Sequence, residues 1–439
     1  MKTITLTASI LMAGAVAALW LEPAEAETRG AAALTSEDFD DRSLLTTQVK
    51  AGDVTLELPA FFDAKLFATL NAKARHLAVR DDGTVYVRLE RASGGGSLVA
   101  LKDTDGDKRA DREVRFGGAG GTGVHVHKGH LYYSTNTAIF RRPFKGDALV
   151  PAGDEQTVVS DLPRQRSHAA KPLAFDEAGH VFTMVGAPSN ACMRQARTQG
   201  SPGLKPCPQL KEHGTIWRFR DDALNQRFSD GERFATGLRQ VVALDWNPGE
   251  KRLFAVQHGR DQLHDLFPKY FTTRESAELP AEEMLALKPG FVGGWPYTYY
   301  DWRRGKRMVA PEYGGDGKRA EKAGRYPDPV QAFPGHYAPN DLVFYTGKQF
   351  PEQYRGAGFV VFHGSWNRAP HRQRGYHIAW VPKNGGKPKV FVTGFSGKAK
   401  LATPGDARHR PMGIAVGPSG ELYVSDSVRG AIWRIDYLG

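Results

Sequence analysis

The chain has 439 residues, a formal net charge of +11 at pH 7 and 41% hydrophobic residues. This apolar content over this length excludes a disordered chain, because it suffices for a large buried core. The 49 glycines and 27 prolines argue against a helical bundle and favour short strands joined by tight turns, so we expect an all-β protein.

The first 26 residues have the pattern of a secretory signal peptide. Lys2 precedes an apolar run over residues 4–21, and Ala24-Glu25-Ala26 fits a small-x-small cleavage site. Pro23 disfavours the alternative, a membrane anchor, and no later stretch is apolar over the ~18 residues that a bilayer span needs. We therefore expect a periplasmic or secreted protein, with no membrane span after signal cleavage.

The positive net charge restricts the kinds of partner that we expect. Cleavage after Ala26 would raise the net charge to +12. Because an exported protein rarely meets nucleic acid, we expect no nucleic-acid partner. The charge instead indicates attraction to anionic ligands or to an acidic protein.

One short pattern recurs six times: an apolar strand, a turn that contains glycine, and a second strand rich in Tyr, Phe and Val. Most copies are followed by a further alternating strand. Three to four strands repeated six times are typical of a six-bladed β-propeller, whereas a pair of β-sandwiches would not explain six similar hairpins. In chain order, the copies span residues 76–87, 123–133, 173–182, 243–254, 342–362 and 413–424.

The repeats define the expected domain organisation. After the signal peptide, residues 27–44 form an N-terminal segment and residues 45–439 form one propeller domain. Residues 54–58, ahead of the first copy, are a candidate for the outer strand that closes the ring with the last blade. Long insertions separate some copies, and in a propeller they gather on one face, which usually holds the site.

The two cysteines predict a local disulfide. Cys192 and Cys207 lie fifteen positions apart in a segment rich in glycine and proline. In an oxidising compartment such a pair staples a loop that has little core of its own. The chain has no Cys-x-x-Cys-His motif, so we expect no c-type haem.

An acidic loop near the first copy has the spacing of a calcium-binding loop. Asp103, Asp105, Asp107 and Asp111 stand at positions 1, 3, 5 and 9, with a glycine at position 4. Position 12 holds valine instead of glutamate. We interpret the segment as a partial calcium loop of structural role; the alternative is an acidic turn between strands.

Several strings resemble the soluble pyrroloquinoline quinone (PQQ) dependent sugar dehydrogenases, in the branch that includes sorbosone dehydrogenase. The resemblance runs from about residue 66 to the C-terminus. The most specific string is His-Gly-Ser-Trp-Asn-Arg at residues 363–368. The others lie at residues 237–247, 294–297, 336–345 and 410–418.

The resemblance implies PQQ and Ca²⁺ as cofactors. PQQ is a flat tricarboxylate quinone, so its pocket needs cations, a flat group to stack on and a divalent metal. Arg239 resembles the arginine beside the reactive carbonyl, and Gln240 stands where many relatives have asparagine. Met412 replaces a family arginine, which leaves Arg408 as a possible substitute. The implied cofactor contacts are Arg75, Arg239, Gln240, His336, Trp366, Asn367, Arg408 and Arg410.

An isolated arginine or tryptophan at these places would indicate only an exposed ion pair or packing between blades. The functional interpretation is favoured because the residues stand near the beginning of an inner strand in different repeats. In a propeller such positions converge on one mouth.

The resemblance also implies a general base and a calcium site. A sugar hydroxyl must lose its proton as hydride leaves the anomeric carbon, and imidazole is the usual base. His168 and His336 both match family histidines; we favour His168 and keep His336 as a cofactor or substrate contact. Gly259 and Arg260 fall where the family offers main-chain oxygens to the PQQ-bound calcium.

We therefore expect an oxidoreductase that oxidises an aldose or a sorbosone-type sugar and passes electrons to a separate acceptor such as cytochrome c. Two alternatives differ in class. A calcium-dependent lactonase would need convergent Glu, Asp and Asn ligands at the mouth. A binding propeller without enzymatic activity would capture an anionic glycan or a partner protein.

Overall fold

The structure is a computed structural model that describes Met1 and residues 39–439. The predicted signal peptide after Met1, and most of the expected N-terminal segment, lie outside the described residues. The regular secondary structure of the described residues is almost entirely β-strand, and no helix among them is both long and apolar enough to cross a membrane.

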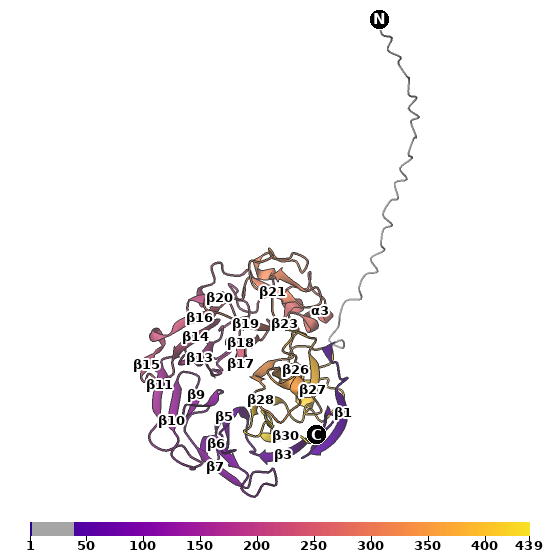
Figure 1. Ribbon diagram of the computed structural model, residues 1–439. Coiled ribbons are helices and arrows are strands. Elements are labelled where there is room, and N and C mark those ends of the chain that lie inside the picture. Colours follow the sequence, from indigo (N-terminus) through magenta and orange to yellow (C-terminus); the bar gives the residue numbers. More distant parts are fainter. Residues whose placement is uncertain (2–38) are drawn as a thin grey trace. The chain divides into compact units, whose positions relative to one another are not determined.

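Six sheets follow one another around a ring (Figure 1). The first contains β4 (Ala74–Val79), β5 (Val85–Ser93), β6 (Gly96–Lys102) and β7 (Arg112–Phe116). The second contains β8 (Val124–His127), β9 (His130–Ser134), β10 (Ile139–Pro143), β11 (Gln156–Ser160) and the short β15 (Gln226–Arg227). The third contains β12 (Ala174–Phe175), β13 (His180–Val185), β14 (Thr215–Arg220), β16 (Glu232–Thr236) and β20 (Phe291–Val292).

The other three sheets have four strands each. The fourth contains β17 (Val241–Asn247), β18 (Arg252–Gln257), β19 (Glu282–Leu287) and β23 (Gln331–Phe333). The fifth contains β24 (Pro339–Phe344), β25 (Gly358–Phe362), β26 (His377–Val381) and β27 (Lys389–Val392). The sixth contains β28 (Pro411–Val416), β29 (Leu422–Asp426), β30 (Ala431–Tyr437) and β3 (Phe62–Thr69). The predicted six-bladed β-propeller is confirmed.

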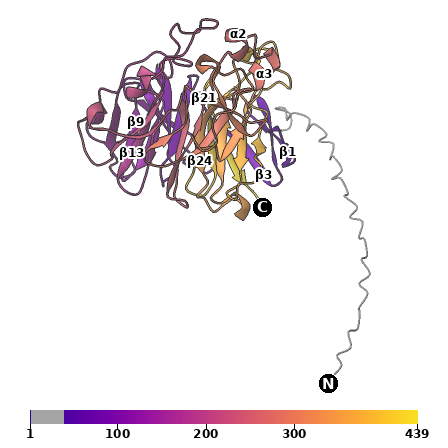
Figure 2. The same cartoon turned by 90° about the horizontal axis from the view of Figure 1, so that it is seen from above.

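The ring carries smaller elements in addition to its six sheets. Two hairpins stand outside the six sheets: β1 (Leu45–Ala51) with β2 (Val54–Pro59), and β21 (Thr298–Asp301) with β22 (Lys306–Val309). The α-helices are α2 (Leu263–Leu266) and α3 (Thr273–Glu278), which lie at one end of the strands in Figure 2. Short 3-10 turns span Pro208–Lys211, Phe228–Asp230, Pro311–Tyr313, Glu352–Tyr354 and Pro404–Asp406.

The prediction for the strand that closes the ring was wrong. The outer strand of the sixth sheet is β3, which pairs antiparallel with β30 from Phe62 opposite Tyr437 to Thr69 opposite Ala431. Residues 54–58 instead lie in β2, which pairs with β1. Both segments alternate between buried and exposed side chains, so the pattern alone does not tell which one joins the sheet.

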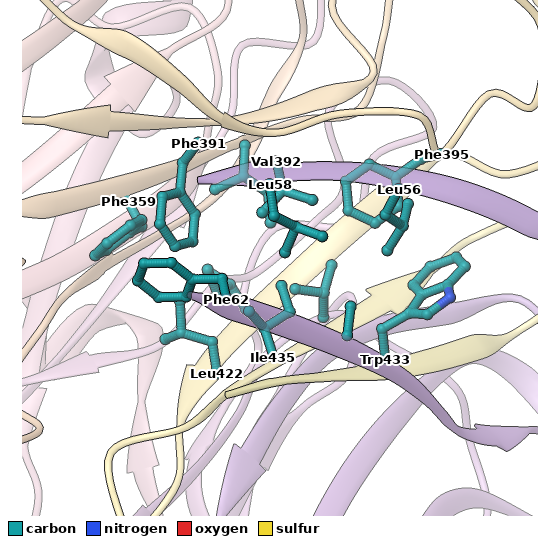
Figure 3. Close-up of a cluster of buried hydrophobic side chains, with 14 of the residues drawn as sticks. Leu56, Leu58, Phe62, Phe359, Phe391, Val392, Phe395, Leu422, Trp433 and Ile435 are labelled. Atoms are coloured by element: carbon teal, nitrogen blue, oxygen red, sulfur yellow. The ribbon is translucent and has the colours of Figure 1, made fainter. Parts of the chain in front are cut away.

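The β1–β2 hairpin covers the outer part of the fifth and sixth sheets. Leu56 and Leu58 of β2 are fully buried in one cluster with Phe391, Phe395 and Trp433 (Figure 3). Their burial explains why β2 is apolar on one face although it is outside the propeller sheets.

All first strands begin at the same face of the ring, which we call the mouth face. The first and second strands of each sheet are antiparallel, so the second strand ends there too. Residues just before a first strand and just after a second strand therefore meet at the mouth. The first strands begin at Ala74, Val124, Ala174, Val241, Pro339 and Pro411.

The predicted disulfide is confirmed. Cys192 and Cys207 are bonded, with their Cα atoms 6.1 Å apart, in the long connection between β13 and β14. This connection leaves the end of a second strand and so belongs to the mouth face. Both cysteines pack with Ala187 and Trp295 in a small cluster.

Candidate active site

Asp261 is the centre of a hydrogen-bonded network at the mouth. Its Oδ2 accepts from Arg239 Nη2 at 2.7 Å and from Arg197 Nη2 at 3.0 Å, and its Oδ1 accepts from Asn367 Nδ2 at 3.0 Å. Burial by itself would raise the pKa of Asp261, but the charges of Arg239 and His336 and the bond from Arg197 outweigh it and lower the pKa. The carboxylate therefore stays ionised and joins three segments.

Arg239 lies just before β17 and is 4% exposed. Its Nη1 donates to the carbonyl oxygen of Gly259 at 2.9 Å, while its Nη2 pairs with Asp261. Burial lowers the pKa of this guanidinium, and the charge of Asp261 opposes that effect. Its Nε, also buried, has no hydrogen-bond partner within residues 39–439. One donor of a buried cation is thus left for a ligand.

His168 presents a ring nitrogen without a hydrogen-bond partner among the described residues, next to this arginine. Its Nδ1 lies 2.5 Å from the carbonyl oxygen of Ala187, which only accepts, so Nδ1 carries the proton. The neutral ring then has its lone pair on Nε2. Burial lowers the pKa of His168 to about 3, with a further lowering by the charge of Arg239. The imidazole is therefore neutral at pH 7.

His336, the competing candidate, is bound more tightly on its Nε2 side. This nitrogen lies 2.8 Å from the carbonyl oxygen of Ser276 and 3.1 Å from that of Leu279, so it donates. The side chain is 7% exposed, and burial lowers its pKa, although the charge of Asp261 raises it. His336 thus fixes the connection that contains α3 to the mouth.

Gln240 follows Arg239 and is 3% exposed. Its Oε1 has no hydrogen-bond partner in the part of the chain that the structure describes. A Cβ atom at Gly186 would lie 2.0 Å from this oxygen, so only glycine leaves the amide in place there. An unpaired buried acceptor next to the unpaired Nε of Arg239 marks a polar site for a ligand.

Trp366 and Arg410 form a flat platform. Trp366 is 62% exposed, and the guanidinium carbon of Arg410 lies 4.4 Å from its ring centroid. Arg410 donates to the main-chain carbonyls of His363 and Gly364, and burial lowers its pKa to about 10. Its charge is therefore directed to the backbone and to the indole, and it supports the exposed tryptophan from below.

The remaining predicted cofactor contacts divide into two groups. Arg75, on β4, is half-buried and donates to Thr122 Oγ1 at 3.4 Å; its charge lowers the pKa of His363, after burial and Arg410. Asn367 is exposed and belongs to the Asp261 network. Arg408, in contrast, donates to the main-chain oxygen of Asp53 between β1 and β2 and does not join the mouth residues.

The two predicted main-chain calcium ligands lie at the end of β18. The carbonyl oxygen of Gly259 accepts from Arg239, and the Gly259 N–H donates to Glu282 Oε2 at 2.8 Å. The Arg260 side chain is buried, pairs with Glu312 and donates to the carbonyl oxygen of Asp261 at 3.0 Å. The backbone around Gly259 and Arg260 is thus fixed by the hydrogen bonds of Gly259 and by the contacts of the Arg260 side chain.

The acidic loop between β6 and β7 lies at the face opposite the mouth. Ligand oxygens of Asp103, Asp105 and Asp111 all lie within 4.8 Å of one another. Asp107 is outside this group, and its Oδ1 accepts from the Arg109 N–H at 2.8 Å. The structure therefore brings three of the four predicted carboxylates together.

Sequence reasoning missed several residues of the mouth. Asp261 and His258 follow β18, and Asn190 and Arg197 follow β13, so both pairs come after a second strand. His258 Nε2 donates to the carbonyl oxygen of Pro339 at 2.8 Å, and Asn190 exchanges hydrogen bonds with the backbone of Asp261. The sequence signal that could have found these residues is their position: residues that follow a second strand lie at the mouth, beside the beginnings of the first strands.

The fold and the mouth define a six-bladed propeller whose central opening is lined by buried arginines and neutral histidines. The sequence model of the TrAA12-like family matches residues 57–292 and 301–437. The chain belongs to this family.

Two relatives show the degree of sequence similarity. An uncharacterized protein of Borreliella burgdorferi is 27% identical over 222 residues, which cover 49% of this chain and 51% of that protein. A PQQ-dependent pyranose dehydrogenase of Coprinopsis cinerea is 31% identical over 117 residues, covering 24% of this chain and 15% of that protein. The chain thus spans about half the length of the first relative and less of the second.

The structural comparison covers much more of the chain. The holo form of the PQQ domain of the Coprinopsis cinerea pyranose dehydrogenase superposes with a TM-score of 0.69 at 18% identity. The match covers 88% of this chain and 98% of that domain. At this identity the likeness shows a shared fold. Together with the match to the TrAA12-like family model, it confirms the resemblance to the PQQ-dependent sugar dehydrogenases.

Proposed function

We propose that this protein is an exported PQQ- and Ca²⁺-dependent oxidoreductase that oxidises an aldose or a sorbosone-type sugar. The observation that carries the proposal is the His168 Nε2, which has no hydrogen-bond partner in residues 39–439, beside the buried Arg239 at the mouth. Relatives of the same fold are named as pyranose and aldose sugar dehydrogenases, which supports the same class of reaction.

The unpaired groups at the mouth fit an anionic quinone. Arg239 Nε and Gln240 Oε1 are buried and unpaired within the described chain, and Trp366 offers an exposed flat face. Arg75 and Arg239 would pair with PQQ carboxylate or carbonyl oxygens, Trp366 would stack on the ring system, and Asn367 would donate to it. When bound, PQQ supplies the two-electron acceptor for the hydride of the sugar.

His168 takes the proton of the sugar hydroxyl in this proposal. The base form is present at pH 7, but a base with a pKa near 3 accepts a proton poorly. An anionic ligand beside Arg239 would offset the positive charge that lowers this pKa, so binding would move His168 toward the working range. Arg239 would stabilise the negative charge that develops on the acceptor oxygen.

Calcium belongs to the proposal at two places. The main-chain oxygens of Gly259 and Arg260 would bind the ion next to the cofactor, and the Arg239 bond to Gly259 would then be shared or lost. Asp103, Asp105 and Asp111 would bind a second ion of structural role, for which their spacing is suitable.

The disulfide and the charge support the remaining parts of the proposal. A Cys192–Cys207 bond is typical of an oxidising compartment, so we propose a periplasmic or secreted location. Electrons would pass to a separate acceptor such as cytochrome c, docked by an acidic face against this basic protein.

Reconstitution tests the proposal directly. Purified protein is loaded with PQQ and Ca²⁺, and dye reduction is followed with a panel of aldoses and aldehydes. Saturable reduction that disappears on chelation of calcium is expected. Hydrolysis of sugar lactones without dye reduction would favour a lactonase, glycan binding without any turnover would favour a binding propeller, and either result would overturn the proposal.

A pair of variants separates the two candidate bases. His168→Gln should lower kcat by about 10²-fold or more and remove the acidic limb of the pH profile. His336→Gln should act mainly on KM or on cofactor affinity. A pH profile that is lost in His336→Gln and kept in His168→Gln would reverse the assignment.

A further inference from the structure

A groove of about 780 Å³ lies between the first and second sheets, outside the residues placed at the mouth above. At the mouth face it is lined by residues 118–120 after β7, residues 135–138 between β9 and β10, and residues 164–166 after β11. Further along, it is lined by Tyr133, Phe140 and Glu155. Its volume falls in the range of small-molecule sites, ~300–1,000 Å³.

Gln165 joins the groove wall to the proposed base. Its Nε2 donates to the main-chain oxygens of Ser167 at 2.7 Å, His168 at 3.0 Å and Gly186 at 2.9 Å. Consecutive Cα atoms are ~3.8 Å apart, so the Cα atoms of Gln165 and His168 lie within about 11 Å of each other. The groove therefore opens close to His168, on a segment that three hydrogen bonds hold in place.

The groove is positively charged at the end near His168, and its wall carries polar groups. Arg164 and Arg166 are exposed, and neither makes an ion pair or hydrogen bond with any residue between 39 and 439. Asn136 and Thr137 add amide and hydroxyl groups. At the far end the Glu155 carboxylate is engaged, because Tyr133 donates its hydroxyl to it at 2.5 Å.

We propose that this groove is a subsite for an acidic oligosaccharide, whose uronate carboxylate pairs with Arg164 and Arg166 while its reducing-end sugar lies at His168. The proposal rests on the proposed function, since oxidation at the anomeric carbon involves only the reducing-end residue. The other sugar residues must extend away from His168, and the groove offers polar space there. Two unpaired guanidinium groups select a carboxylate over a neutral sugar.

Binding to PQQ-free protein tests the subsite without any turnover. Calorimetric titration compares a disaccharide in which glucuronate is linked to glucose with its neutral counterpart, in which glucose replaces glucuronate. The wild type should bind the acidic form about tenfold more tightly, and Arg164→Gln/Arg166→Gln should abolish this preference. The matched control is Lys251→Gln/Arg252→Gln, which removes the same charge from exposed positions at the opposite face.

A steric variant and a kinetic measurement complete the test. A Cβ atom at Gly118, which lines the groove, would meet no atom within 4 Å, so we expect Gly118→Phe to be accommodated and to narrow the groove. In the PQQ-loaded enzyme it should lower kcat/KM for the acidic disaccharide about tenfold and leave that for glucose unchanged. Equal binding of the two disaccharides by the wild type, or an equal loss in the control variant, would overturn the subsite. Absence of dye reduction with all sugars would instead refute the proposed function, while the binding result still decides the groove.

Discussion

Asp261 at the mouth and Asp245 in the central cavity below it have opposite surroundings. Asp261 accepts side-chain hydrogen bonds from Arg239, Arg197 and Asn367. Asp245 lines a cavity of about 330 Å³ between the first strands, and its Oδ2 accepts from the Phe344 N–H at 2.8 Å.

The two carboxyl groups differ in charge because of these partners. Arginine neighbours keep Asp261 ionised, with a lowered pKa. Burial raises the pKa of Asp245 to about 7, since backbone N–H groups stabilise the anion less than a guanidinium does. Asp341 lines the same cavity, and burial raises its pKa well above the usual range. The mouth thus keeps its carboxylate charged, whereas the cavity favours protonated carboxyl groups below about pH 7, although both aspartates are partly buried.

Among these substitutions, Arg239→Ala at the mouth should have the largest effect. It removes the cation from Asp261 and the proposed stabiliser of the reacting oxygen, so kcat should fall by about 10²–10³-fold in the PQQ-loaded enzyme. Dye reduction measures the loss, and circular dichroism checks that the all-β fold is kept. Arg252→Ala, at an exposed position on the opposite face, is the control and should retain full activity. An active Arg239→Ala enzyme would show that this residue is not at the reaction centre.

Asp261→Asn tests whether the mouth needs the negative charge. The amide keeps the size of the side chain but leaves Arg239 and Arg197 without their counter-charge. The free energy of unfolding should fall by about 3 kcal/mol, as measured by urea denaturation. Unchanged stability would mean that solvent, rather than Asp261, balances these arginines.

The corresponding substitution in the cavity, Asp245→Asn, should raise the free energy of unfolding instead of lowering it. Between about pH 4 and pH 7 folded Asp245 keeps its proton while the unfolded chain has lost it, so wild-type stability falls as pH rises through this window. Asp245→Asn removes the contribution of Asp245 to this dependence, while that of Asp341 remains, and should stabilise the protein at pH 7.5 by roughly 1–3 kcal/mol. Melting temperatures at pH 5 and pH 7.5 measure it, and a difference between variant and wild type that is independent of pH would contradict it.

A third carboxylate environment, at the rim, should give the smallest effect. His409 lies between Asp426 Oδ2 at 2.9 Å and Asp53 Oδ1 at 2.8 Å. Burial would lower the pKa of His409, but these two carboxylates outweigh it and raise the pKa. This stabilisation is complete below about pH 6.5 and is lost as pH rises through the raised pKa.

Asp53→Asn should remove part of that pH dependence. Asp53 is 45% exposed, so the loss should stay below about 1 kcal/mol at pH 6. It should be smaller at pH 9, where only the contacts of Asp53 with Arg429 and Arg408 remain. Melting curves at the two pH values measure it. A larger loss at pH 9 than at pH 6 would show that His409 is not the group that titrates.

The sequence predicted the elements that depend on local pattern. Six hairpins with glycine turns indicated six blades, and the fifteen-residue spacing indicated the Cys192–Cys207 bond. It failed for the closing strand, where residues 54–58 were preferred over β3. Both segments pack in the cluster with Phe391 and Trp433, and only the backbone pairing, β3 with β30 and β2 with β1, decides which of them joins the sheet.

The sequence predicted individual residues of the site, but not the hydrogen-bonded network that connects them. His168, Arg239 and Trp366 were named from strings that resemble a family, and the structure places all three at the mouth face. Asp261, the centre of the network, was missed because its partner Asn367 is 106 positions away and Arg239 is 22. Arg408 was named as a substitute for the family arginine that Met412 replaces, but its side chain donates to the main-chain oxygen of Asp53.

By itself the sequence determined the repeat, the all-β class and the surplus of positive charge, because these follow from neighbouring residues and composition. The tertiary structure alone decided which charges meet, which imidazole nitrogen is left free and which carboxyl groups stay neutral. The physical reason is that a pKa and a hydrogen bond depend on burial and on partners brought together by ring closure, and neither is encoded in the spacing of residues along one strand.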